Sequence, residues 1–325
     1  MSGTMMDNKP LPPSSAAAET PRSPDEAGPI VPLSQALSRT GGRSEIVLRV
    51  IFSCTRWLLY LMIVWFIFRL ETWLAESFDV NILWRRMITE ASMMLAAILP
   101  AFLMAQIEGR PFGDFGLPAR AAFRGNFWVG AAWGIASLTI LMLALRAAGA
   151  FRFGALDLHG ARILKFALYY AAFFLLTGFF EEFLWRGYSQ WVLSKGMHFW
   201  PAAALLSGSF GAIHGYNPGE ASIGLVAVVA IGFFFCLTLR RTGNLWWAVG
   251  FHMSWDWAES FLYSVPDSGT MAPGHLLTSS LHGPAWLTGG SVGPEGSYLV
   301  FGLLAALWVL FDRIYPEVKY VEVRS

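Results

Sequence analysis

Residues 163–185 have the sequence ILKFALYYAAFFLLTGFFEEFLW, an apolar run long enough to cross a lipid bilayer as a helix, with two adjacent glutamates near its end. The rest of the chain has the same character. Of its 325 residues, 55% are hydrophobic and 14% are charged, and the mean hydropathy is +0.49. A soluble domain carries about 25% charged residues, so the composition excludes a soluble enzyme, a disordered protein and a disulfide scaffold. It predicts an all-α fold, a polytopic transmembrane helical bundle.

Eight apolar segments are predicted to span the membrane. They lie at about residues 52–70, 87–107, 126–145, 163–185, 198–214, 221–239, 245–263 and 297–311. Their continuous apolar character argues against a membrane β-barrel, whose strands alternate. A helix running from 163 to 195 would be about 50 Å long, well over the bilayer core, so we expect it to break near Gly187 or to project into the cytoplasm. Turns are expected near 196–198 and 241–244.

Two parts of the chain differ from these spans. Residues 1–45 are rich in Pro, Ser, Ala and Gly and are predicted to form a disordered cytoplasmic tail. Residues 46–325 then form one transmembrane domain, with its functional core in 163–263. Residues 264–296 contain no Lys or Arg and are predicted to be an irregular loop on the outer face, with a lid over the bundle as the alternative.

Charge gives the orientation and narrows the partners. Lys and Arg are more numerous on the side of the N-terminus, so the positive-inside rule places both termini in the cytoplasm. The net charge of +1 gives no reason to expect a nucleic-acid partner. Cys54 and Cys236 lie far apart in apolar runs and are interpreted as apolar fillers. Arg56, inside the first span, either reaches the interface or faces the bundle interior.

Ionisable residues inside membrane spans are costly and usually functional. Glu182 and Arg186, four residues apart, share one helix face and can pair. Glu181 points about 100° away from Glu182 and is free for another role. Ordinary interfacial charge at a helix end is the alternative interpretation of these glutamates.

Two histidine motifs accompany this pair. His214 follows Phe210 by four residues, and His252 precedes Asp256 by four, so His252 and Asp256 share a helix face. Either motif alone is also compatible with a hydrogen-bonded core residue. Counted from the two expected turns, however, Glu181, His214, His252 and Asp256 come to similar depths, so we expect them to converge in one polar pocket. A glutamate beside an imidazole can deprotonate water, and further donors can stabilise an oxyanion, which is the chemistry of a hydrolase without a covalent nucleophile.

The motifs Glu181-Glu182-x-x-x-Arg186, Phe210-x-x-x-His214 and His252-x-x-x-Asp256, in this order, resemble those of the CPBP (CAAX protease and bacteriocin-processing, or Abi) family. That family includes the type II CAAX prenyl endopeptidase. The resemblance covers residues 181–256 and implies an intramembrane glutamate-dependent endopeptidase. It implies that Glu181 is the base, assisted by His214, that His252 and Asp256 line the oxyanion site, and that Glu182, Arg186 and Phe210 support them.

The last position departs from the prenyl endopeptidase pattern, which usually has Asn where this chain has Asp256, as many bacterial members do. An ionised aspartate cannot donate to an oxyanion, so Asp256 must be protonated or must hold His252 as the donor. A His₂Glu zinc site is conceivable, but the chain has no His-Glu-x-x-His motif, so a cofactor-free, metal-independent reaction is favoured.

The sequence therefore predicts an integral membrane peptidase that hydrolyses a peptide bond of a membrane-associated or prenylated-type substrate. The resemblance further implies a bacterial inner membrane. Two alternatives remain at this point: a non-proteolytic membrane scaffold or immunity-type protein with the same motifs, and a proton-coupled transporter that uses the polar cluster as a relay.

Overall fold

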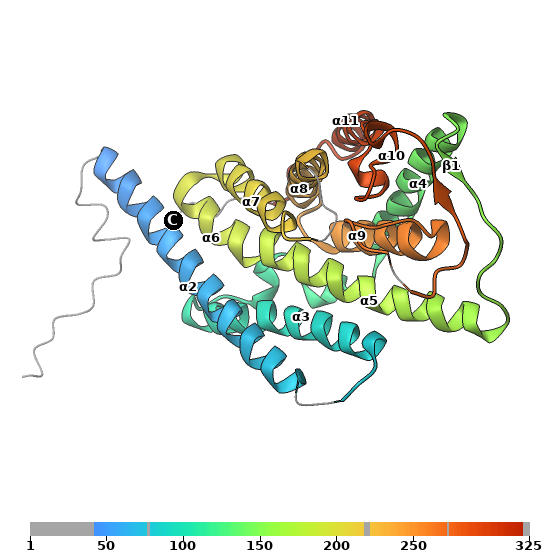
Figure 1. Cartoon of the computed structure of the whole chain (residues 1–325). Helices are drawn as coiled ribbons and strands as arrows, with labels where there is room; N and C mark the ends of the chain where they lie inside the picture. Colours follow the sequence, from blue (N-terminus) through green and yellow to red (C-terminus); the bar gives the residue numbers. More distant parts are fainter. Residues whose placement is uncertain (1–41, 77–78, 218–221, 272, 321–325) are drawn as a thin grey trace, which may run out of the picture.

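The computed structural model describes residues 42–76, 79–217, 222–271 and 273–320, and nearly all of its regular structure is helical (Figure 1). The elements are α2 (Gly42–Glu76), α3 (Ile82–Ile107), the 3-10 turns η1 (Phe112–Phe115) and η2 (Ala119–Ala121), α4 (Gly125–Ala147), β1 (Phe151–Arg152), α5 (Ala161–Arg186), α6 (Tyr188–Met197), α7 (Phe199–His214), α8 (Ser222–Thr242), α9 (Trp246–Trp257), the π-helical η3 (Ala258–Tyr263), β2 (Ser280–Leu281), α10 (Ala285–Thr288), η4 (Pro294–Gly296) and α11 (Leu299–Ile314).

The all-α membrane bundle predicted from composition is confirmed, but the count of eight spans is not. Every predicted span coincides with a helix. By length and apolar composition, five helical segments among the described residues can cross a membrane: Ser44–Leu74, Ile82–Ile107, Gly125–Ala147, Ala161–Met197 and Ser222–Thr242.

The other three helices are too short. Helices α7, α9 and α11 have 16, 12 and 16 residues. At 1.5 Å per residue they are roughly 18–24 Å long, less than the roughly 30 Å of bilayer core. Hydropathy alone does not distinguish a spanning helix from a short helix packed among its neighbours, so the count of eight is not confirmed.

The N-terminal tail was predicted for residues 1–45, and residues 1–41 of it lie outside the described residues. Helix α2 begins at Gly42, so it includes the last four residues of the predicted tail. Residues 42–45 of the predicted tail are therefore helical.

The long helix breaks where its length required a break. Gly187 separates α5 from α6 with φ −83° and ψ −114°, and a Cβ there would lie 2.4 Å from the carbonyl oxygen of Phe183. The two expected turns are also present. His198 joins α6 to α7 with φ 68°, and Gly243 lies between α8 and α9 with φ 79°. The polar motifs therefore sit on adjacent helices that fold back on one another.

Glycines bring α9 unusually close to α4. A Cβ at Gly130 would lie 2.0 Å from the carbonyl oxygen of Trp247, and a Cβ at Gly134 would lie 2.2 Å from Ser254 Oγ. In the opposite direction, a Cβ at Gly250 would lie 2.1 Å from the carbonyl oxygen of Phe127. Small residues let helix backbones approach in this way inside membranes. Helix α9, which carries His252 and Asp256, is thereby fixed against α4, and its other side packs on α5.

The structure shows where Arg56 and the two cysteines lie. Arg56 faces the bundle interior, where its guanidinium contacts Glu108, and Lys195 Nζ lies 3.5 Å from the same carboxylate. Cys236 is fully buried and Cys54 partly buried, and both are free thiols. Cys236 Sγ lies 3.9 Å from Gln190 Oε1, so this thiol has a polar neighbour as well as apolar ones.

The segment 264–296 is tied to the bundle by backbone pairing. β1 and β2 pair in antiparallel fashion, with Phe151 opposite Leu281 and Arg152 opposite Ser280. The amide of Asp157 also donates to Leu276, and the amide of Leu276 donates to Phe261 in η3. The segment is irregular, as predicted, and it folds inward enough to contribute side chains to the cavity described below.

We predict that Gly250→Leu lowers the free energy of unfolding by about 1–3 kcal/mol or more, because the new side chain meets the backbone of α4. Thermal unfolding of the purified protein in detergent measures the effect. Gly208→Leu is the matched control, since a Cβ at Gly208 on α7 meets nothing within 4 Å among the described residues. Equal losses in the two variants would contradict close packing of α4 and α9.

Candidate active site

The predicted polar residues face one cavity of about 150 Å³, which is partly open to its surroundings. Its polar lining consists of Thr177, Glu181, His214, Asn217, His252, Asp256, Asp267, Ser268 and Glu295. Aromatic and aliphatic side chains of α5, α7, α8, α9 and α11 form the rest of the wall, among them Phe174, Phe235 and Leu304. The cavity thus joins a strip of titratable groups to a large apolar surface.

Glu182 and Arg186 form a fully buried ion pair on α5. Arg186 Nη1 donates to Glu182 Oε1 over 3.2 Å, and neither side chain is exposed. The guanidinium carbon lies 4.4 Å from the centre of the Phe210 ring, close enough for a cation–π interaction. The pairing expected from the i, i+4 spacing is present. Phe210, four residues before His214, is the aromatic surface on which Arg186 rests.

His252 is the centre of the titratable cluster. Its Nδ1 lies 3.0 Å from Glu182 Oε1, and its Nε2 lies 3.4 Å from Asp256 Oδ2 and 3.6 Å from Glu181 Oε2. A carboxylate can only accept, so the bond to Glu182 is donated by Nδ1–H. The sequence placed Glu182 in a supporting role, and in the structure Glu182 contacts both Arg186 and the ring of His252.

His214, at the end of α7, lines the same cavity. Its Nδ1 donates to the carbonyl oxygen of Phe210 over 2.8 Å, which leaves Nε2 as the ring nitrogen available to a ligand. Among the described residues, no hydrogen bond or ion pair joins His214 to Glu181. The structure therefore brings Glu181, Glu182, His252 and Asp256 into direct contact and places His214 on the cavity wall with them.

A further carboxylate beside Glu181 was missed at the sequence level. Glu90 on α3 accepts a hydrogen bond of 3.0 Å from Thr177 Oγ1, and Thr177 precedes Glu181 by one helical turn. A glutamate inside a predicted apolar span was a usable signal, because such residues are rarely neutral to function. Glu259, inside the predicted span 245–263, was overlooked in the same way, although it is completely buried.

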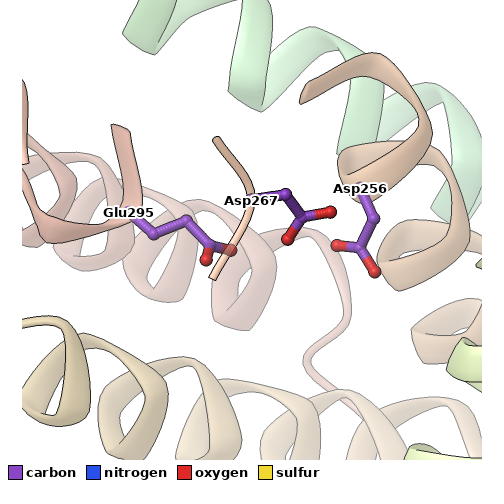
Figure 2. Close-up of side chains that lie close together, drawn as sticks. All are labelled: Asp256, Asp267 and Glu295. Carbon is purple, nitrogen blue, oxygen red and sulfur yellow. The ribbon is translucent and has the colours of Figure 1, made fainter. Parts of the chain in front are cut away.

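Two acidic residues reach the cavity from the irregular segment. Asp267 and Glu295 lie beside Asp256, and one carboxylate oxygen from each of the three lies within 4.8 Å of the others (Figure 2). Burial raises the pKa of Asp267, and the carboxylates of Asp256 and Glu295 raise it further. Both residues lie in a loop between predicted spans, where acidic side chains are common and do not by themselves indicate a site.

Comparison with known families bears on these motifs. Residues 163–258 match the family model described as type II CAAX prenyl endopeptidase Rce1-like. The segment is Rce1-like. The family recognised from the three motifs is therefore confirmed over this segment, which includes Glu181, His214, His252 and Asp256. No curated protein and no solved structure gives a significant match to the chain.

Only some of the residues that line the cavity belong to the Rce1-like segment. The matched residues end two positions after Asp256, so they contain the His252 cluster but not Asp267 or Glu295. Glu90 also lies outside the match. The cavity is thus lined both by residues of the matched segment and by residues outside it, among them Asp267 and Glu295.

We predict that Arg186→Met lowers the free energy of unfolding by about 3–5 kcal/mol, because it leaves Glu182 charged, buried and without its cation. Adding Glu182→Gln to that variant removes the uncompensated charge and restores part of the loss. Thermal unfolding of both variants checks this order. Lys319→Met is the control: Lys319 pairs with Glu317 at an exposed site, where an ion pair contributes about 1 kcal/mol or less. A double variant less stable than Arg186→Met would contradict this account of the pair.

Proposed function

We propose that the protein is an intramembrane glutamate-dependent endopeptidase that hydrolyses a peptide bond with an activated water molecule. The observation that carries the proposal is the contact of Glu181 with His252, 3.6 Å apart, at the wall of a cavity within an Rce1-like segment. A base and a hydrogen-bond donor are there side by side, on the wall of a partly open cavity. The chemistry requires no nucleophilic serine or cysteine and no cofactor.

Glu181 acts as the general base. It accepts a proton from a water molecule as the water oxygen attacks the carbonyl carbon of the peptide bond. His214 helps to position that water through Nε2, since its Nδ1 is already bonded to the Phe210 carbonyl. When the carbon–nitrogen bond breaks, the proton on Glu181 passes to the leaving nitrogen, which restores the carboxylate.

His252 stabilises the oxyanion. Three carboxylates surround its ring, and this arrangement favours the imidazolium form, which donates from both nitrogens. With Nδ1–H donated to Glu182, Nε2–H remains for the negative charge that develops on the substrate oxygen. Asp256, whose Oδ2 lies 3.4 Å from Nε2, orients the ring in the free protein and gives up that N–H when the oxyanion forms.

The cavity wall suggests the class of substrate. Apolar side chains of five helices surround the titratable strip, so an apolar or lipid-modified peptide segment can lie along them while its scissile bond meets Glu181. The substrate is accordingly a membrane-associated peptide or a protein of the prenylated type. Besides the substrate, the partner is the lipid bilayer, and no nucleic acid takes part. We place the protein in a bacterial inner membrane with both termini in the cytoplasm, in keeping with the distribution of Lys and Arg.

We predict that Glu181→Gln lowers kcat/KM by at least about 10²–10⁴-fold, because the amide cannot accept the proton of the water. The assay uses the purified protein in detergent with a library of apolar and prenylated peptides. Glu317→Gln, which removes an exposed carboxylate, serves as the control and retains activity. Cleavage by the Glu181→Gln variant at the control rate would refute the proposal.

If neither the wild-type protein nor the variants cleave any peptide, the result favours a scaffold or immunity-type protein. Proton-coupled uptake into vesicles by the wild-type protein would instead favour a transporter. These outcomes distinguish a peptidase from a scaffold or immunity-type protein and from a proton-coupled transporter.

A reaction based on Glu181 needs no zinc, so we predict that 1,10-phenanthroline leaves the rate unchanged. This reagent binds metals that prefer nitrogen ligands, such as zinc, and has little affinity for ions that prefer oxygen ligands. The rate is measured on one peptide before and after treatment, and then after addition of zinc. Loss of activity on treatment and recovery with zinc would contradict the metal-independent mechanism.

A further inference from the structure

Three residues of α5 line the cavity, and their spacing places them on one face of the helix. They are Phe174, Thr177 and Glu181, which follow one another at intervals of three and four positions. At 1.5 Å per residue, Thr177 lies about 6 Å along the helix axis from the proposed base, Glu181. This strip presents an aromatic ring, a hydroxyl and a carboxylate to the cavity, and the proposed mechanism uses only the carboxylate.

The proton of the Thr177 hydroxyl is held away from the cavity. Thr177 Oγ1 lies 3.0 Å from Glu90 Oε2 on α3 and 3.2 Å from the carbonyl oxygen of Phe173, and it donates toward both. The described residues that line the cavity include neither Glu90 nor Phe173. A hydroxyl has one proton and two acceptor lone pairs. Because that proton is directed at α3 and at the backbone of α5, Thr177 can only accept hydrogen bonds from the cavity.

Thr177 is therefore an uncharged acceptor on a largely apolar wall. The other hydroxyl among the described lining residues, that of Ser268, donates to Glu295 on the loop side of the cavity. A neutral acceptor in apolar surroundings suits a neutral donor, since an ammonium or guanidinium group loses far more hydration energy on burial. The backbone N–H of a bound peptide is such a donor, and it needs an acceptor once it has left water.

The distance between Thr177 and Glu181 matches the geometry of an extended peptide. Each residue of an extended chain advances about 3.3 Å, so about 6 Å along α5 corresponds to about two residues. A peptide whose scissile bond lies at Glu181 thus brings a backbone N–H to Thr177 within about two residues of that bond.

We propose that Thr177 binds the substrate by accepting a hydrogen bond from a backbone N–H within about two residues of the scissile bond. Glu90 is a positioning residue that holds the proton of Thr177 away from the peptide. The inference rests on the proposed endopeptidase function and adds a substrate-binding residue to it. A hydrogen bond to the main chain sets the register of the peptide against Glu181 without selecting its side chains.

Peptide binding to the full chain in detergent tests the contact. The Glu181→Gln protein is used, so that bound peptide is not cleaved, and fluorescence polarisation of labelled apolar and prenylated peptides gives Kd. Each amide is replaced in turn by an ester, which removes the N–H and keeps the length of the backbone. We expect one replacement to raise Kd by about 5–10-fold, because it leaves Thr177 without a donor.

Adding Thr177→Val to this protein should abolish the ester effect at that one position. Thr177→Ser keeps the hydroxyl and should retain it. Thr55→Val is the matched control, since Thr55 on α2 makes the same bond to the carbonyl four residues before it but is exposed. The ester effect is a ratio of two affinities for one protein, so partial unfolding of a variant does not alter it. An equal ratio with and without Thr177→Val would overturn the proposal.

Two variants of Glu90 test its positioning role. Glu90→Gln keeps an acceptor for the proton of Thr177 and should retain the ester effect. Glu90→Met has no acceptor, so the hydroxyl can turn toward the cavity and donate to the ester, and the ratio should fall. A merely structural role for Glu90 would weaken binding of the amide and ester peptides alike and leave the ratio unchanged, which would overturn the assignment.

The outcomes keep this inference separate from the proposed function. Binding with an ester effect that depends on Thr177, but without cleavage by the wild-type protein, would refute the peptidase and support the peptide contact. Cleavage by the wild-type protein together with an ester effect that Thr177→Val leaves unchanged would overturn the contact alone. Failure of every peptide to bind in a saturable manner would also overturn it.

Discussion

The buried ion pair between Glu182 and Arg186 is the interaction on which the rest of the site depends. A carboxylate without exposed surface persists in an ionised form only if a cation compensates it, and Arg186 does so from the next turn of the same helix. Glu182 can then accept the Nδ1 proton of His252, which turns Nε2 toward Glu181 and Asp256. Phe210 covers the guanidinium, so one side chain of α7 also supports the pair.

Helix packing also determines where the titratable side chains lie. Helix α9 is too short to cross a bilayer, and its position is set by glycine contacts with α4 and by packing on α5. Gly187 separates α5 from α6, and the turn at His198 lets α7 return so that His214 lines the same cavity as Glu181. A small set of glycines therefore controls where the titratable side chains meet.

Two parts of the chain supply the polar residues of the cavity. The Rce1-like segment supplies Glu181, His214, His252 and Asp256, together with the apolar wall of α5, α7 and α8. The irregular segment after it supplies Asp267 and Glu295, and Asp256 belongs to both groups.

The sequence alone determined the all-α membrane class, the break at Gly187, the Glu182–Arg186 pair and the proximity of Glu181 to His252, because these follow from apolar run length and from helical spacing. It did not determine how many helices cross the membrane, since α9 and the long spans have similar hydropathy. It also passed over Glu90, Glu259, Asp267 and Glu295. Which carboxylates face one another depends on how distant segments pack, and only the tertiary structure decided that.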